Sequence, residues 1–90
     1  MKEHRDSSNR LTIELSGDDG QFNLYASRLK STHRAKLTNK LDGLDQRYWD
    51  FKIKGKTVVL HSDNYMGVSV HIEDGTNDDL LRSIAEEITK

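Results

Sequence analysis

The sequence contains no cysteine and no proline. Without cysteine the chain forms no disulfide, offers no thiolate to a metal and has no thiol nucleophile. Without proline, and without a run rich in glycine or serine, it shows no sign of an interdomain linker. Its 90 residues are therefore expected to form one domain with one modest core.

An excess of charge of one sign is also missing. Fourteen Lys and Arg stand against fifteen Asp and Glu, which leaves a formal net charge of −1. This balance gives no overall attraction to nucleic acid or to an anionic membrane. No apolar run approaches the roughly 20 residues that span a bilayer, and no apolar segment follows the charged start as it would in a secretory signal. We expect a cytoplasmic protein.

Residues 47–73 hold four of the six aromatic residues and all four valines, and they predict three consecutive antiparallel strands. Short turns at 54–56 and 63–67, each with a glycine, separate them. Apolar residues alternate with polar ones, as in a sheet with one buried face. The apolar rows are Trp49, Phe51 and Ile53, then Val58 and Leu60, then Val68, Val70 and Ile72.

The flanking segments predict one more strand and two helices. Residues 11–15 alternate as a strand. A helix is expected to follow directly after Asp18, with Asp18 and Gln21 as a capping box, and to end near residues 32–34. A second helix is expected near the end, capped by one of three residues. Those residues are Thr76, Asn77 and Asp78. Residues 1–10 carry nothing to bury and predict a mobile tail.

Residues 35–41 fit two patterns. Their leucines extend the stripe of the first helix, and they also alternate with polar residues as in a half-buried strand. We favour the strand, because it leaves a helix of ordinary length and a sheet large enough to cover two helices. The prediction is an α+β two-layer sandwich of order β-α-β-β-β-β-α, in which both helices lie on one face of a mostly antiparallel, four- to five-stranded sheet. Residues 11–90 form this single domain, and residues 1–10 form the disordered tail.

One face of such a sheet is left uncovered. Tyr48, Lys52 and Val59 on that face are candidates for contact with a protein partner. The alternative is a solvated face whose lysines discourage edge pairing. The residues expected there are Lys36, Thr38, Lys40, Tyr48, Asp50, Lys52, Lys54, Thr57, Val59, His61, Ser69, His71 and Glu73.

His61 and His71 fall on neighbouring strands of this face, where diagonal neighbours lie roughly 7–8 Å apart. With Asp63 or Glu73 as an oxygen ligand they are weak candidates for a metal site. Their spacing matches no dedicated metal motif, so we predict neither a metal nor a cofactor.

The turn at 63–67 places Tyr65 and Met66 at its tip. These side chains either make a contact point or fold back over the edge of the core. Lys36, Lys40, Lys52 and Tyr48 offer a weak nucleic-acid surface, because aromatic rings beside lysines stack and neutralise single strands.

Several segments resemble a group of small uncharacterised bacterial proteins with the pattern LDG…YWDF…G…LH…YxG. The matching residues are 41–45, 48–51, Gly55, 60–61 and 65–68. The resemblance favours the strand over residues 35–41 and implies a bacterial, cytoplasmic origin. It carries no activity, cofactor or catalytic residue.

No nucleophile, base and oxyanion donor can be assembled from the sequence, so we predict a protein without catalytic activity. The leading hypothesis is a small interaction domain, an accessory or adaptor protein, that binds an unknown partner or a second copy through its open sheet face. The alternatives are a small-ligand or metal-binding protein centred on His61 and His71, and a weak nucleic-acid-binding accessory protein.

Overall fold

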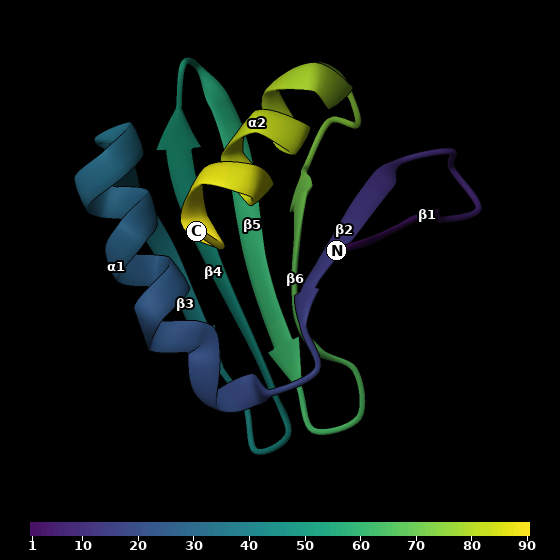
Figure 1. Cartoon of the computed structure of the whole chain (residues 1–90), viewed down its shortest axis with the longest axis vertical. Helices are drawn as coiled ribbons and strands as arrows, with labels where there is room; N and C mark the ends of the chain where they lie inside the picture. The colour runs from purple at the N-terminus through teal and green to yellow at the C-terminus, as the bar shows by residue number, and fades with distance from the viewer.

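The computed structural model describes residues 1–90 as one antiparallel sheet of six strands with two helices on one of its faces (Figure 1). The strands lie side by side in the order β1-β2-β6-β5-β4-β3. Their bounds are Lys2–Arg5 (β1), Leu11–Ser16 (β2), Lys36–Asp42 (β3), Gln46–Ile53 (β4), Lys56–Asp63 (β5) and Gly67–Ile72 (β6). The helices are Phe22–His33 (α1), which follows a 3-10 turn at Asp19–Gln21 (η1), and Asp78–Ile88 (α2). The predicted α+β class is confirmed, and the predicted number of strands is too low.

The core lies between the sheet and the two helices. The apolar rows of β4, β5 and β6 face α1 and α2, as their alternation predicts, and join one cluster of 18 buried residues. From the helices this cluster takes Phe22, Tyr25, Ala26, Leu29, Leu81, Ile84, Ala85 and Ile88. Neither helix is both long enough and apolar enough to cross a membrane.

α1 ends at His33 and β3 begins at Lys36, so the strand predicted over residues 35–41 is confirmed. Arg34 adopts the left-handed conformation with φ 51°, and its N–H donates to the Leu29 carbonyl. The chain then turns back as β3, so the long-helix alternative is wrong. The predicted capping box is also wrong, because Asp18 caps η1 through the Gly20 N–H and Gln21 makes no capping bond. At α2 the Asn77 side chain accepts from the Leu80 N–H, as one of the three predicted caps.

The expected mobile tail instead contributes a strand. β1 pairs with β2 from Lys2 opposite Glu14 to Arg5 opposite Leu11. Two ion pairs with α2 hold it, Arg82 to Glu3 at 3.0 Å and Arg5 to Asp78 at 2.8 Å. All four residues of β1 are exposed, so the strand has no apolar row that sequence periodicity could reveal.

A β-bulge at Thr38 changes the faces of β3. Leu37 pairs with Phe51 and Asn39 pairs with Asp50, which leaves Thr38 as the extra residue. Beyond it the alternation is inverted. Lys40 lies opposite Trp49 on the helix face, with its Nζ 4.2 Å from the ring centroid, and Leu41 lies opposite Tyr48 on the open face. The predictions of Lys40 on the open face and of Leu41 in the core are therefore wrong.

Val59 lies on the open face as predicted but is only 6% exposed. It sits on the central strand β5, directly between Asp50 of β4 and His71 of β6. Neighbouring side chains cover it, so Val59 is not a surface that a partner could contact.

Candidate functional site

The open face of the sheet has a hollow of about 260 Å³ where the N-terminal hairpin meets β5 and β6. Three parts of the chain form it: β1 and β2 with their turn, β4 and β5 with Tyr48 and His61, and β6 with the turn before it. We call it the histidine hollow. Its lining residues are His4, Asp6, Arg10, Thr12, Glu14, Tyr48, His61, Asp63, Met66, Gly67, Ser69 and His71.

The two predicted histidines lie together in this hollow. His61 stacks on Tyr48, with ring centroids 4.2 Å apart and planes inclined by 13°. Burial lowers the pKa of His61, and its Nε2 is buried without a hydrogen-bond partner. Burial also lowers the pKa of His71 to about 4, helped by the nearby Arg10 guanidinium and by His61. Both rings are therefore neutral at neutral pH.

The turn between β1 and β2 brings a charged pair to the hollow. The Asp6 carboxylate accepts hydrogen bonds from the Ser8 hydroxyl at 2.7 Å and from the N–H groups of Ser8 and Arg10. These bonds, with the Ser8 hydroxyl first, lower the pKa of Asp6 to about 2. The Arg10 Nε lies 3.1 Å from Asp6 Oδ2, so this cation is held beside the histidines by its own turn.

The hollow does not supply a metal site. No group of three or more His, Cys, Asp or Glu side chains is placed so as to hold a metal ion. Of the oxygen ligands considered for His61 and His71, Asp63 instead accepts the N–H groups of Tyr65 and Met66. Glu73 does not line the hollow.

The turns β3–β4 and β5–β6 meet at one end of the open face. A hydrogen bond of 3.1 Å from the Asn64 amide to Asp45 connects them. Leu44 is 103% exposed and Tyr65 is 94% exposed at their tips. With Leu41 and Met66, also exposed, they form what we call the loop end. Tyr65 and Met66 thus project into solvent and do not fold back over the core.

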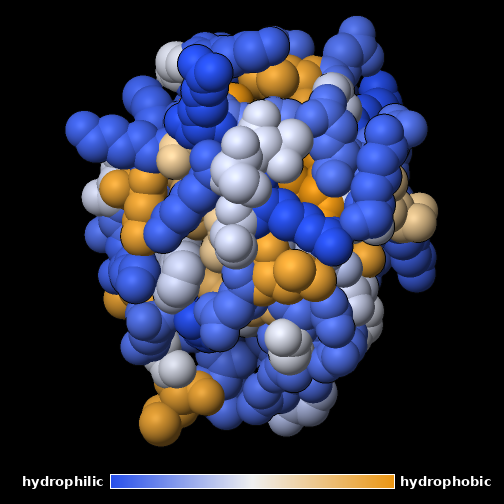
Figure 2. All heavy atoms as spheres, turned by 60° about the vertical axis from the view of Figure 1, so that its left-hand side comes forward, coloured by the Kyte–Doolittle hydropathy of each residue, from blue (hydrophilic) through white to orange (hydrophobic).

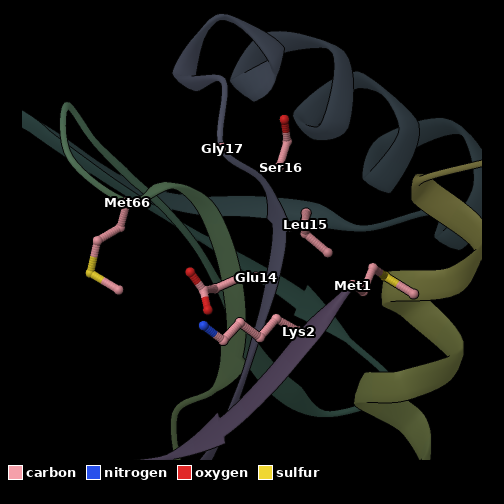
Figure 3. Close-up of a pocket in the computed structure, with 7 residues that line it drawn as sticks. All are labelled: Met1, Lys2, Glu14, Leu15, Ser16, Gly17 and Met66. Atoms are coloured by element: carbon pink, nitrogen blue, oxygen red, sulfur yellow. The ribbon is translucent and has the colours of Figure 1, made fainter.

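A second, shallower hollow of about 380 Å³ lies next to the histidine hollow along β2, at the start of β1. Figure 3 shows the Lys2 ammonium and the Glu14 carboxylate pointing toward each other on the Met66 side, whereas Met1 lies beside α2. Glu14 and Met66 line both hollows, so the two hollows adjoin at these side chains. The remaining lining residues are Leu15, Ser16 and Gly17.

The opposite side of the molecule, around α1 and β3, has no hollow of this kind. Figure 2 shows its apolar atoms in separate patches between long hydrophilic side chains. Lys52 lies there, opposite Lys36 and away from the histidine hollow.

The structure thus brings together four of the seven candidate residues, Tyr48, His61, Met66 and His71. Sequence reasoning missed His4 and Arg10, because the first ten residues showed no apolar period. It also missed Leu41, because a bulge leaves no sign in a pattern of alternation.

The pKa of His71 predicts an acid-sensitive fold. An unfolded histidine takes up its proton near pH 6.5, whereas folded His71 does so near pH 4. Between these values the unfolded state binds more protons, so the free energy of unfolding rises with pH there. We expect the melting temperature to fall as pH is lowered from about 7 to 4, and to fall less steeply in His71→Gln.

The comparison has an internal control. Below about pH 4 the depressed pKa values of Asp6 and Asp74 act in both proteins, so the two curves should run parallel there. Identical slopes of wild type and variant between pH 7 and 4 would contradict the role of His71.

Comparison with known proteins places the chain in a family. No curated protein and no solved structure matches it. The model of one protein family, described as "Protein of unknown function (DUF3630)", matches residues 1–87. The match includes β1 and therefore extends over the segment expected to be a tail. It confirms the expected relation to an uncharacterised family, and the chain belongs to the DUF3630 family of proteins of unknown function.

Proposed function

We propose that the protein is a small interaction domain without catalytic activity, which binds a protein partner on its open sheet face at the loop end. The observation that carries the proposal is that Leu41, near the end of β3, and Leu44, Tyr65 and Met66, on the two adjacent turns, are all exposed at one end of the sheet. Contiguous exposed apolar side chains mark interaction sites more often than scattered ones do. The expectation of a bacterial, cytoplasmic protein belongs to the same proposal.

The loop end is held in shape before any partner arrives. The Asp63 carboxylate accepts the N–H groups of Tyr65 and Met66, and Asn64 donates to Asp45 of the neighbouring turn. Side chains presented by such braced turns lose less conformational entropy on binding. Tyrosine and methionine are also enriched in protein interfaces, and the charged residues around them supply a polar rim.

The test uses the double variant Leu41→Ser/Tyr65→Ser. Both side chains are exposed, so the melting temperature should stay nearly unchanged, whereas binding should weaken at least tenfold if Tyr65 is an anchor. Sedimentation over a hundredfold range of concentration measures association of a second copy. If the wild type is monomeric, affinity capture is carried out with the wild type and with the double variant as baits. A partner that only the wild type retains is then purified, and its binding to both proteins is measured.

Leu24→Ser is the matched control, because Leu24 is an exposed leucine of α1 outside the loop end. It should leave association and capture unchanged. The proposal is wrong if the wild type and the double variant show the same mass and retain the same partners.

A second candidate function is the binding of a small polar molecule in the histidine hollow. The unpartnered, buried Nε2 of His61 favours it, because a bound group could supply the missing hydrogen bond. NMR signals of the His61 and His71 rings, followed during titration with small carboxylates and amides, test this function. Shifts that appear equally in the distant His33 would count against a specific site.

A further inference from the structure

The small net charge hides a strong separation of charge. Residues 22–54, which form α1, β3 and β4, carry eight Lys and Arg against three Asp, a formal charge of +5. The remaining residues carry six Lys and Arg against twelve Asp and Glu, a formal charge of −6. The sheet order places β3 and β4 on one side and β6, β2 and β1 on the other (Figure 1). The molecule is therefore dipolar, with a basic and an acidic side.

The cations of the two sides differ in their partners. On the acidic side four of six form ion pairs: Arg5, Arg10, Lys56 and Arg82 with Asp78, Asp6, Asp74 and Glu3. On the basic side only Arg47 has a carboxylate within 4.0 Å, that of Asp42. Arg28 donates to the Ile88 carbonyl and Lys40 lies over Trp49. The five other cations have no such partner, and we call them the basic corner. They are Lys30, Arg34, Lys36, Lys52 and Lys54.

These five cations come from segments that end or begin at one corner of the fold, with Lys36 and Lys52 on the open face and Lys30 on α1. They come from the end of α1, the start of β3 and the end of β4 with its turn, which meet at the upper left of Figure 1. Lys36 and Lys52 are direct cross-strand partners. Like charges in that position repel each other and destabilise a sheet, so an external anion would relieve the repulsion.

Two cations of the basic corner have the left-handed backbone conformation, which favours glycine and asparagine. Arg34 has φ 51° and Lys54 has φ 50°, whereas the two other non-glycine residues with positive φ are asparagines. The two-residue turn Lys54-Gly55 has positive φ at both positions, for which Asn-Gly is the preferred sequence. Strained conformations of this kind concentrate at functional sites. At both positions a cation is present where the backbone alone favours asparagine or glycine.

The surroundings of the basic corner identify the kind of anion. Protein interfaces are depleted in lysine and need apolar contacts. The exposed large apolar residues all lie outside residues 30–36 and 52–54, at Met1, Leu24, Leu41, Leu44, Tyr65 and Met66. A nucleic-acid backbone, in contrast, is bound through neutralisation of its phosphates by Lys and Arg without apolar contact. We propose that the basic corner binds the phosphate backbone of nucleic acid without sequence preference.

This site goes beyond the proposed protein contact and is separate from it. β3 connects the two, with Lys36 at its start and Leu41 near its end. Of the four residues that the sequence suggested for nucleic-acid contact, only Lys36 and Lys52 belong to the basic corner. Lys40 lies over Trp49, and Tyr48 stacks on His61. Base stacking therefore has no part in the proposal.

The experiment is fluorescence anisotropy of a labelled duplex and of a labelled single strand with the full chain at increasing salt. If all five cations contact phosphates, the slope of log K against log salt should be about −4.5 for the duplex and about −3.5 for the single strand. Lys36→Gln/Lys52→Gln should weaken binding roughly tenfold or more at low salt and reduce the slope by about two.

The matched control is Lys2→Gln/Lys90→Gln, which removes the same charge from lysines outside the basic corner and should change neither quantity. Lys54→Asn separates binding from folding: it should raise the melting temperature by a few degrees, because Asn-Gly suits the turn, and should still weaken binding. The proposal is overturned if the Lys36→Gln/Lys52→Gln variant binds like the wild type or like the control. It is also overturned if a peptide rich in Asp and Glu binds the basic corner more tightly than either oligonucleotide.

Discussion

Replacing Gly67 by alanine is expected to lower the free energy of unfolding by about 4 kcal/mol, from a strained backbone and an overpacked contact together. Gly67 begins β6 with φ +78°, and a Cβ there would lie 2.1 Å from the Ser16 carbonyl oxygen. The nearest atoms belong to the backbone of Ser16 and Gly17, so no side-chain rotation can make room.

Gly55→Ala is the matched control for this prediction. Gly55 has the same φ of +78°, but nothing lies within 4 Å of the position its Cβ would take. Gly55→Ala should therefore lower the free energy of unfolding by only about 1 kcal/mol, from backbone strain alone. Thermal melts should therefore show a decrease of roughly 15–30 °C for Gly67→Ala and roughly 4–8 °C for Gly55→Ala. Equal decreases would mean that β2 does not approach β6 as closely as described.

Phe22→Ala is the second substitution with a large expected effect. Phe22 is 0% exposed at the start of α1, where its ring meets Trp49 edge to face with centroids 5.0 Å apart. The Arg47 guanidinium lies 4.3 Å from the Phe22 ring centroid on the same cluster. Phe22→Ala removes buried apolar area, an aromatic pair and a cation–π contact. Together these losses should lower the free energy of unfolding by about 3–5 kcal/mol.

Leu24→Ala on the same helix is the comparison. Because Leu24 is 42% exposed, its substitution should lower the free energy of unfolding by less than about 1 kcal/mol. Urea unfolding followed by the fluorescence of Trp49, the only tryptophan, measures both variants. If Phe22→Ala does not fold, Phe22→Leu should still fold with a loss of about 1.5 kcal/mol. Similar losses at Phe22 and Leu24 would contradict the described packing of α1 on β4.

The part of the fold that sequence reasoning predicted correctly is the part with periodic burial. Trp49, Phe51 and Ile53 alternate because β4 has one face on the helices, and the same physics locates β5, β6 and the stripe of α1. β1 was missed because its four residues are all exposed and its stabilising partners, Arg82 and Asp78, are far away in sequence.

Of the histidine hollow, the sequence predicted the residues on regular strands and missed those on the N-terminal hairpin. His61 and His71 follow from the strand register, since both face away from the apolar rows. Arg10 enters the histidine hollow through a turn held by Asp6, and hydrogen bonds of a turn leave no periodic signal. The charge separation was present in the sequence, but the net charge concealed it until the sheet order was known.

The bulge at Thr38 makes the surface of this edge depend on the backbone conformation of β3 as well as on its residue types. Because alternation has a period of two, straightening the bulge without loss of a residue would shift the pairing by one and exchange the two sides of β3 from Asn39 onward. Leu41 would move from the loop end to the helix side, and Lys40 would move from Trp49 to the open face. Loss of the Thr38 codon, in contrast, would leave Asn39, Lys40 and Leu41 in their present pairs on a regular strand, so this edge tolerates a change of one residue in length without a change of its surface.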